Sequence, residues 1–419
     1  MTPVPLKRVS DFEKLAFGLF VHWGLYSQLG AGEWVQSNRR IAAADYAGLM
    51  RNFSAADFNA AELARLARTA GMRYIVFTTR HHEGFSLYDT RGLSDFDAPH
   101  SPAGRDLVAE FVAACRENSI VPFFYHTTLD WHWHGKNTVD LDDAEFSEYL
   151  DYLLASVEVL CTNYGKVGGF WFDGNWSRPD SDWKLDRLYG MIRRHQPEAI
   201  IIDNTGVFRA GEVGHLEVDA VTFENQSARP LNREGMRKYA AAEVCRTMNS
   251  HWGTGGNDFN FKSPREIIEL LCSSRGCGAN LLLNIGPEAQ GKIPAYEQAV
   301  LELAGRWLKI FGESVYDPRP VSGLKYQGRD FLLRNGRDCY YFAFDLGISG
   351  DANVTVDVAG IGTRAVDGFH EKVISAYWLD NAQKVNFIQD CRNDMLALQC
   401  NGFPYGVHTV VRVMKLETR

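Results

Sequence analysis

The chain has 419 residues, more than one ordinary domain needs unless that domain is an α/β barrel, which takes ~250 residues or more. Hydrophobic residues make up 45% and charged residues 23%, so a disordered or low-complexity protein is excluded. The net charge of −8 and the lack of a basic block argue against a nucleic acid or an anionic membrane as the main partner.

Eight cysteines without a CxxC pair do not form a disulfide scaffold or a structural metal motif. The first apolar run, Phe17–Trp23, is too short for the core of a signal peptide. No apolar run approaches the ~18 residues of a membrane span. These features predict a cytoplasmic protein. Secretion of a processed form stays open as an alternative, because a removed signal would leave no trace.

The first 320 residues repeat one pattern, in which a short apolar run is followed by a polar turn and an amphipathic helical stretch. The apolar runs predict strands at Phe17–Trp23, Tyr74–Thr79, Val121–Tyr125, Gly169–Phe172, Ala199–Ile202, Ala220–Phe223, Asn280–Ile285 and, more weakly, Ala241–Arg246. The helical stretches are Asp57–Ala70, Arg105–Asn118, Asp143–Tyr164, Asp182–His195, Pro264–Arg275 and Tyr296–Phe311. Strands alternating with helices predict an α/β fold with a parallel sheet. Eight candidates favour a (β/α)8-like, TIM-type barrel, distorted if the weak seventh strand is incomplete.

The tail of the chain has a different pattern, with short alternating runs separated by Gly, Asn and Asp turns. Strands are predicted at Phe331–Leu333, Tyr340–Phe344, Val354–Val358, Val373–Trp378, Leu396–Gln399 and Thr409–Met414. This pattern predicts a small C-terminal antiparallel β-sandwich. Two prolines and a glycine interrupt the chain between Asp317 and Gly323, so the expected domains are a barrel over residues 1–320 and a sandwich over 321–419.

Polar and aromatic residues follow nearly every predicted barrel strand. The strand ends carry His22-Trp23, His81-His82-Glu83, Tyr125-His126, Trp171 with Asp173, Asp203-Asn204, Glu224-Asn225 and Asn284, with Glu33-Trp34 and Asp130-Trp131 in the loops beyond. Because catalytic groups of such barrels lie at the carboxyl ends of the strands, these residues are expected to converge on one rim.

This combination of side chains predicts a sugar site. Trp and Tyr faces suit the C–H side of a sugar ring, and His, Asn and carboxylate groups suit its hydroxyls. Asp173, at a strand end, fits a nucleophile, and Glu224 or Glu243 fits the general acid/base. Retention needs carboxyl groups ~5–5.5 Å apart and inversion ~6.5–9.5 Å, a distance that the residue order leaves open.

Four segments resemble the α-L-fucosidases of glycoside hydrolase family 29. They are FGLFVHWGLYS at Phe17–Ser27 followed by Glu33-Trp34, YIVFTTRHHEGF at Tyr74–Phe85, WFDG at Trp171–Gly174 and NLLLNIGP at Asn280–Pro287. The resemblance implies a retaining exo-hydrolase of terminal α-L-fucosyl groups, built as a barrel with a C-terminal β-sandwich. It implies a fucosylated oligosaccharide or glycoconjugate as the partner, and neither a metal nor a cofactor.

The resemblance also implies roles for single residues. Asp173 matches the family nucleophile in its Trp-Phe-Asp-Gly setting. The positions that hold fucose are matched by His22, Glu33, Trp34, His81, His82 and Tyr125, with Trp171 beside the nucleophile. Glu224 is our choice of acid/base, and Glu243, whose Ala-Glu-Val-Cys segment lacks the family's Trp, is the runner-up. His126, in place of a small hydroxyl residue, and Trp252 are expected in the walls of the sugar pocket.

Three other functions stay open at this point. A metal-dependent barrel hydrolase is disfavoured, because no HExxH occurs and no HxH follows the first strand. A non-catalytic relative that binds fucose or a glycan would keep the pocket without hydrolysis. A glycosidase for a galacto-configured sugar would use the same hydroxyl arrangement. The sequence carries no signal for the oligomeric state.

Overall fold

The computed structural model describes residues 2–227, 229–350 and 359–419. The chain divides into two compact units. One holds Met1–Ser227, Leu231–Lys262 and Asn280–Glu302, and the other holds Ser263–Ala279 and Leu303–Arg419. The second unit therefore includes a helical segment that precedes the last barrel strand in the chain. The domain bounds at 320 and 321 stay a prediction.

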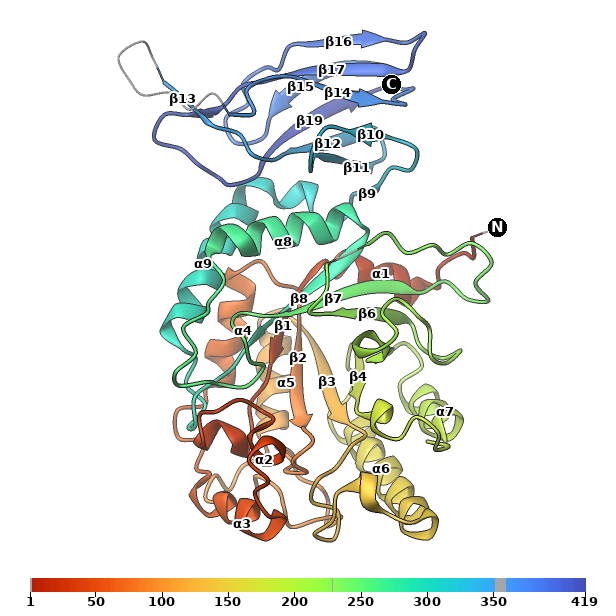
Figure 1. Cartoon of the computed structure of the whole chain (residues 1–419), viewed down its shortest axis with the longest axis vertical. Helices are drawn as coiled ribbons and strands as arrows, with labels where there is room; N and C mark the ends of the chain where they lie inside the picture. Colours follow the sequence, from red (N-terminus) through yellow and green to blue (C-terminus); the bar gives the residue numbers. More distant parts are fainter. Residues whose placement is uncertain (1, 228, 351–358) are drawn as a thin grey trace. The chain divides into compact units, whose positions relative to one another are not determined.

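The eight predicted barrel strands are all present and close into a parallel barrel (Figure 1). They are β1 (Phe17–Val21), β2 (Tyr74–Arg80), β3 (Val121–Thr127), β4 (Gly169–Asp173), β5 (Ile200–Asp203), β6 (Ala220–Glu224), β7 (Ala241–Thr247) and β8 (Ala279–Ile285). Pairing of β1 with both β2 and β8 closes the ring. The strands are buried on both faces, which explains their continuous apolar sequence. The predicted (β/α)8 barrel is confirmed.

The irregular part of the barrel is not the seventh strand. The strand β7 has seven residues and pairs with β6 over five register positions. The neighbouring ladder is shorter, because β5 has four residues and meets β6 only at Ile202 and Ala220. β5 and β6 end in the acidic residues Asp203 and Glu224.

Helices α4, α5, α6 and α7 lie outside the strands of the first unit (Figure 1). The helices that the sequence pattern predicted are α4 (Ala60–Thr69), α5 (Leu107–Glu117), α6 (Asp143–Asn163), α7 (Leu185–His195), α8 (Pro264–Gly276) and α9 (Ala295–Phe311). The predicted start of α4 at Asp57 is early because the Asn59 side chain accepts the Glu62 N–H and so caps the helix. Helix α6 begins at a capping box formed by Asp142 and Glu145.

A helix that the polar N-terminus did not predict, α1 (Lys7–Leu15), packs against the amino ends of the barrel strands. Its Phe12 ring lies 5.7 Å from the Tyr74 ring and 5.8 Å from the Phe123 ring. The Asn280 side chain donates to the Phe12 carbonyl. At Gly18 a Cβ would lie 2.3 Å from the Tyr74 ring, so only glycine leaves room for this packing.

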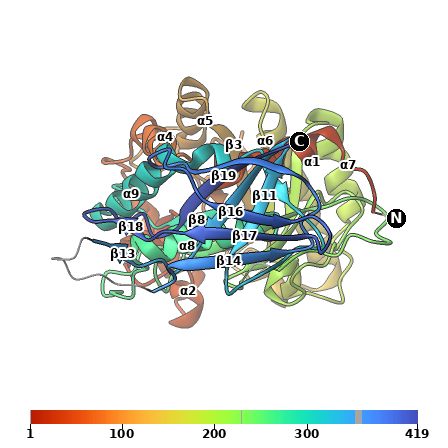
Figure 2. The same ribbon diagram turned by 90° about the horizontal axis from the view of Figure 1, so that it is seen from above.

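The C-terminal part of the second unit forms two antiparallel sheets, as the prediction of a β-sandwich requires. One sheet has the order β10 (Lys325–Tyr326), β14 (Gly362–Asp367), β17 (Met395–Cys400) and β16 (Phe387–Asp390), and Figure 2 shows the last three side by side. The other has the order β15 (Val373–Trp378), β19 (Arg412–Thr418), β12 (Asp338–Ala343), β11 (Phe331–Asn335) and β9 (Arg319–Pro320). Val366 and Leu398 of the first sheet share a buried core with Leu332, Trp378 and Leu416 of the second.

The remaining predictions for this part of the chain have mixed outcomes. The sequence pattern missed β14 and β16, and a short pair formed by β13 (Ile348–Ser349) and β18 (Phe403–Pro404). The predicted strand at Val354–Val358 lies outside the described residues. Across the ranges that the structure describes, no helix combines the length and the apolar character needed to cross a membrane. All eight cysteines are free thiols.

Candidate active site

A cavity of about 300 Å³ lies at the carboxyl ends of the barrel strands. Nine of the predicted site residues line it: His22, Trp34, His81, His82, Tyr125, Trp171, Asp173, Glu224 and Trp252. Five residues to which the sequence gave no catalytic or binding role also line it: Phe20, Trp176, Val207, Phe208 and Asn204, the last of which was expected on the rim. The strands β1 to β6 all contribute to its wall, directly or through the residues that follow them.

Asp173, the last residue of β4, accepts hydrogen bonds on both carboxylate oxygens. Tyr125 donates to Oδ2 at 3.0 Å, and the Trp176 indole donates to Oδ1 at 2.8 Å. His82 Nε2 lies 3.4 Å from Oδ2. Burial by itself would raise the pKa of Asp173, but these hydrogen bonds and the charge of His82 outweigh it and lower the pKa below its ordinary value. Asp173 is therefore an ionised carboxylate with fixed orientation.

Glu224, the last residue of β6, has a pKa shifted in the opposite direction from that of Asp173. Burial raises its pKa to about 7, and the negative charges of Asp173 and Glu33 add to this effect. Below about pH 7, one ionised and one protonated carboxyl group thus face the same cavity. This division is what an acid-assisted nucleophilic displacement requires.

Asn204 joins the two carboxyl groups. Its Nδ2 lies 3.2 Å from Asp173 Oδ1 and 2.5 Å from Glu224 Oε2, and its Oδ1 accepts the Thr222 hydroxyl. The two carboxylate oxygens can be no farther apart than these two distances laid end to end. The limit applies to this one pair of oxygens, and it is compatible with the ~5–5.5 Å separation of the carboxyl groups in retaining glycosidases.

Both adjacent histidines face the cavity, although neighbours in a strand would point to opposite faces. The reason is that β2 ends at Arg80, so that His81 and His82 lie in the turn beyond the strand. Burial lowers the pKa of His81 well below its ordinary value and the pKa of His22 to about 3. His22 Nδ1 lies 2.7 Å from the Asn284 side-chain oxygen, which requires the proton on Nδ1. These two rings are neutral hydrogen-bonding groups.

Aromatic rings form the rest of the cavity wall. The Tyr125 ring stacks on the Trp171 ring with centroids 5.6 Å apart and on His81 at the same spacing. Trp34 stacks on Trp176 at 6.0 Å. Such rings present apolar faces to the C–H groups of a sugar, while the histidine nitrogens and carboxylates remain for its hydroxyls.

Glu243 does not line this cavity. Its Oε2 accepts the Tyr74 hydroxyl at 2.6 Å and its Oε1 accepts the Trp171 indole N–H at 2.9 Å. In the parallel register it lies opposite Thr222, two residues below Glu224. Since a strand rises ~3.3 Å per residue, Glu243 is ~6–7 Å deeper in the barrel. The structure therefore places the runner-up acid/base beneath the site, with both oxygens engaged.

Two further residues that were expected to contact the substrate do not line the cavity. His126 points away from the cavity because it alternates with Tyr125 along β3, and its ring contacts the Thr127 carbonyl and Ser156. Glu33 also lies outside the cavity lining. Its Oε2 accepts the backbone N–H groups of Trp252 and Gly253 at 3.0 and 2.8 Å. Glu33 thus holds the loop that presents Trp252.

Sequence reasoning overlooked Trp176, and it placed Asn204 on the rim without giving it a role in the site. Asn204 follows β5, so the strand-end rule that selected Asp173 and Glu224 also applied to it. Trp176 lies in a short turn after β4, and no pattern in the sequence signals its bond to Asp173. Among the residues with described coordinates, no group of three or more His, Cys, Asp or Glu could hold a metal ion.

A closed (β/α)8 barrel with an ionised and a protonated carboxyl group in an aromatic cavity defines a glycoside hydrolase. The sequence model of the family described as alpha-L-fucosidase matches residues 6–313. The chain belongs to this family, glycoside hydrolase family 29.

Known proteins agree with this assignment. The tissue alpha-L-fucosidase of Mus musculus is 30% identical over 335 residues, which cover 74% of this chain and 72% of that protein. The structure of alpha-L-fucosidase isoenzyme 1 from Paenibacillus thiaminolyticus is 30% identical, with a TM-score of 0.81 over 99% of both chains. A family 29 alpha-L-fucosidase from Bacteroides thetaiotaomicron, 23% identical, shares the fold with a TM-score of 0.82 over 100% of this chain and 96% of its own.

Proposed function

We propose that this fucosidase-family chain hydrolyses terminal α-L-fucosyl linkages with retention of configuration, using Asp173 as nucleophile and Glu224 as general acid/base. The observation that carries the proposal is the shared contact of both carboxyl groups with Asn204 Nδ2. It holds one oxygen of each carboxyl group close to the other, as the short carboxyl separation of a double displacement requires.

In the first step an Asp173 oxygen forms a bond to the anomeric carbon while the bond from that carbon to the leaving oxygen breaks. The leaving oxygen takes the Glu224 proton, so the leaving group departs as a neutral alcohol. In the second step Glu224, now a carboxylate, takes a proton from water as the water oxygen bonds to the anomeric carbon. Asp173 leaves as a carboxylate and Glu224 is protonated again.

The cavity supports an exo mode of action on a single neutral sugar. Its volume of about 300 Å³ lies at the lower end of the ~300–1,000 Å³ that small-molecule sites occupy. The neutral rings of His22 and His81 supply hydrogen bonds without adding charge. A fucosylated oligosaccharide or glycoconjugate is the proposed partner.

Hydrolysis of an aryl α-L-fucoside tests the proposal directly. We expect turnover, and proton NMR of the reaction mixture should show the α-anomer of fucose before it mutarotates. First appearance of the β-anomer would contradict retention. An aryl β-D-galactoside turned over faster than the fucoside would favour the galacto-configured alternative. Fucose binding without any turnover would favour the non-catalytic relative.

The raised pKa of Glu224 predicts a pH dependence. For a fucosyl disaccharide, kcat/KM should fall as the pH rises through about 7, because Glu224 loses the proton that the leaving oxygen needs. It should fall again only below the ordinary pKa of an aspartate, where Asp173 becomes protonated. The measurement is a kcat/KM profile from pH 3 to 9.

A substitution of Glu33 checks whether Glu224 causes the fall of kcat/KM on the alkaline side of the profile, which we call the upper limb. The Glu33 charge raises the pKa of Glu224, so Glu33→Gln should move that limb to lower pH. The glutamine oxygen can still accept the N–H groups of Trp252 and Gly253. An unchanged limb in this variant would show that Glu224 is not the group that titrates.

A cytoplasmic location also stays a proposal. It is supported by Cys391, an exposed thiol without a disulfide partner, since such thiols persist in reducing compartments.

A further inference from the structure

The side chain of Asn204 lies between the two catalytic carboxyl groups and takes no proton in the proposed mechanism. Asn204 is buried directly after β5. One N–H of its amide faces Asp173 Oδ1 and the other faces Glu224 Oε2, so both hydrogens of Nδ2 are in use. Its Oδ1 accepts the hydroxyl of Thr222 at 3.0 Å. The amide is therefore held from both of its ends.

Asp173 and Thr222 together fix the orientation of this amide. An ionised carboxylate only accepts hydrogen bonds, so the amide nitrogen must be the atom that faces Asp173. The amide oxygen then faces Thr222, a buried residue of β6, whose hydroxyl donates to it. Removing this hydroxyl would take the donor from a buried oxygen and leave the amide free to tilt away from the carboxyl groups.

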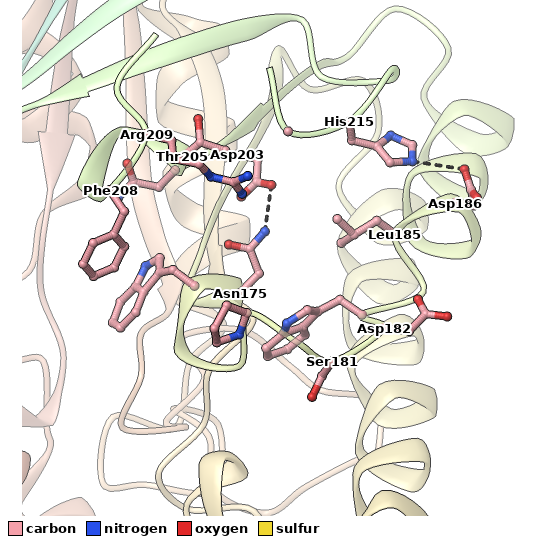
Figure 3. Close-up of a pocket in the computed structure, with 15 residues that line it drawn as sticks. Asn175, Ser181, Asp182, Leu185, Asp186, Asp203, Thr205, Phe208, Arg209 and His215 are labelled. Atoms are coloured by element: carbon pink, nitrogen blue, oxygen red, sulfur yellow. Dashed lines mark hydrogen bonds and ion pairs between the residues drawn. The ribbon is translucent and has the colours of Figure 1, made fainter. Parts of the chain in front are cut away.

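The end of β5 is held firmly to the strand that carries the nucleophile. The Asn204 backbone N–H donates to the Phe172 carbonyl of β4 at 2.9 Å. Asp203 faces the opposite side of the chain from Asn204, and its Oδ2 accepts the Asn175 amide of the segment after β4 at 2.8 Å (Figure 3). These two contacts fix the position of Asn204 relative to the β4 end of the site.

The end of β5 is held to β6 mainly through side chains. The described backbone ladder between these strands is the single pair of Ile202 and Ala220. Asn204 and Thr222 are each two residues beyond that pair, where the next contact of a parallel register would fall. Their side-chain hydrogen bond therefore joins the two strands at the height where the ladder has ended, just below Glu224.

The contact with Asn204 also selects the oxygen of Glu224 that carries the acid proton. Because Oε2 accepts an Asn204 N–H at 2.5 Å, the proton of the neutral carboxyl group lies on Oε1. Once that proton has been transferred, Glu224 is a carboxylate and the same N–H bond becomes charge-assisted. At that stage Asp173 has lost its charge in the bond to the sugar. The amide thus has one ionised carboxyl group to bind before and after the first step.

We propose that Thr222 and Asn204 are a positioning pair for the reaction. Thr222 fixes the Asn204 amide, and the amide holds the carboxyl groups of β4 and β6 together and keeps the acid proton of Glu224 on Oε1. This inference rests on the proposed hydrolytic function and adds to it the two residues that align its acid/base.

Weakening the amide contact has a defined effect on the pKa of Glu224. Burial and the charges of Asp173 and Glu33 raise this pKa, whereas the Asn204 hydrogen bond lowers it by favouring the carboxylate. The titratable groups that face Glu224 from neighbouring elements are Asp173 of β4, Glu33 of the loop after β1, Tyr125 of β3 and Cys245 of β7. Burial raises the pKa of the last two well above their ordinary values, so both stay uncharged where Glu224 titrates. A weaker Asn204 bond therefore raises the pKa of Glu224.

Thr222→Val and Thr222→Ser separate the hydroxyl from the shape of the side chain. Valine has nearly the shape of threonine without the hydroxyl, and Thr222→Val should lower kcat/KM for a fucosyl disaccharide by about fivefold. Its upper limb should move to higher pH by about half a pH unit, because the bond that lowers the pKa of Glu224 is weakened. Thr222→Ser keeps the hydroxyl and is the matched control, with kcat/KM within about twofold of wild type and the limb in place.

Asn204→Leu removes the amide itself at nearly constant size. It should lower kcat/KM by about tenfold or more and move the upper limb in the same direction by about one pH unit. A limb that stays in place in both Asn204→Leu and Thr222→Val would overturn the positioning pair. So would a Thr222→Ser variant that behaves like Thr222→Val, since the hydroxyl would then have no part in the effect.

Infrared titration measures the protonated carboxyl group of Glu224 without hydrolysis, and its band is assigned by its loss in Glu224→Gln. We expect the midpoint to rise in Thr222→Val and Asn204→Leu and to stay in place in Thr222→Ser. Unmoved midpoints would overturn the positioning pair even if fucosides were hydrolysed. Shifted midpoints in a protein whose wild type hydrolyses no fucoside would support the pair and contradict the hydrolytic function instead.

Discussion

Replacing Asp173 by alanine is expected to lower kcat/KM for an aryl α-L-fucoside by about 10⁴-fold or more. The variant lacks the oxygen that forms the bond to the anomeric carbon, and no other carboxylate described in the cavity lies in its place. Glu224 holds its proton below about pH 7, and Glu243 lies deeper in the barrel. The measurement is steady-state hydrolysis together with a thermal unfolding curve that shows the variant to be folded.

Azide distinguishes a lost nucleophile from a damaged pocket. In Asp173→Ala the azide ion can attack from the emptied side, and the product should be fucosyl azide of inverted configuration. Asp180→Ala removes an exposed aspartate from the segment that follows the same strand and serves as the control with unchanged activity. Full activity in Asp173→Ala would contradict the assignment of Asp173 as the nucleophile.

Removing Glu224 is expected to produce the second-largest loss, and its size should depend on the leaving group. For a fucosylated oligosaccharide, Glu224→Ala should cost about 10²–10⁴-fold in kcat/KM, because an unactivated alcohol leaves poorly without a proton. For an aryl fucoside with an acidic phenol the first step should be much less affected. Azide should then accelerate the second step and yield fucosyl azide of retained configuration.

Glu243→Gln is the comparison that decides between the two acid/base candidates. The glutamine can still accept a hydrogen bond from Trp171 or Tyr74, so the variant should retain most activity and should not respond to azide. The assignment of Glu224 would be overturned if Glu224→Ala behaved like wild type while a Glu243 variant showed rescue by azide.

The residue pattern predicted the architecture well because the signals of this fold are local. Each barrel strand is buried on both faces and therefore forms an apolar run, and each run ends where polar residues begin. Polar residues at strand ends of a parallel barrel must meet at one rim, whatever the loops do. That rule placed Asp173 and Glu224 in the site before any distance was known.

Side chains alternate between the two faces of a strand. Because Tyr125 faces inward, this alternation could have excluded its neighbour His126 from the cavity wall. It could not predict that His81 and His82 both face the cavity. That outcome depends on β2 ending at Arg80, where a register shift against β3 interrupts the ladder. Where a strand ends depends on its pairing partners, and those partners are distant in the sequence.

By itself, then, the sequence determined the barrel, the β-rich tail and the strand-end residues that face a sugar. The reason is that buried apolar runs and the polar residues that end them can be recognised within short segments of the sequence. Only the tertiary structure decided which carboxyl group shares the cavity with Asp173. The register of β6 against β7 places Glu243 beside Thr222 and leaves Glu224 at the rim. The contact of Asn204 with both carboxyl groups has the same origin, because it joins the ends of three strands whose spacing is set by closure of the barrel.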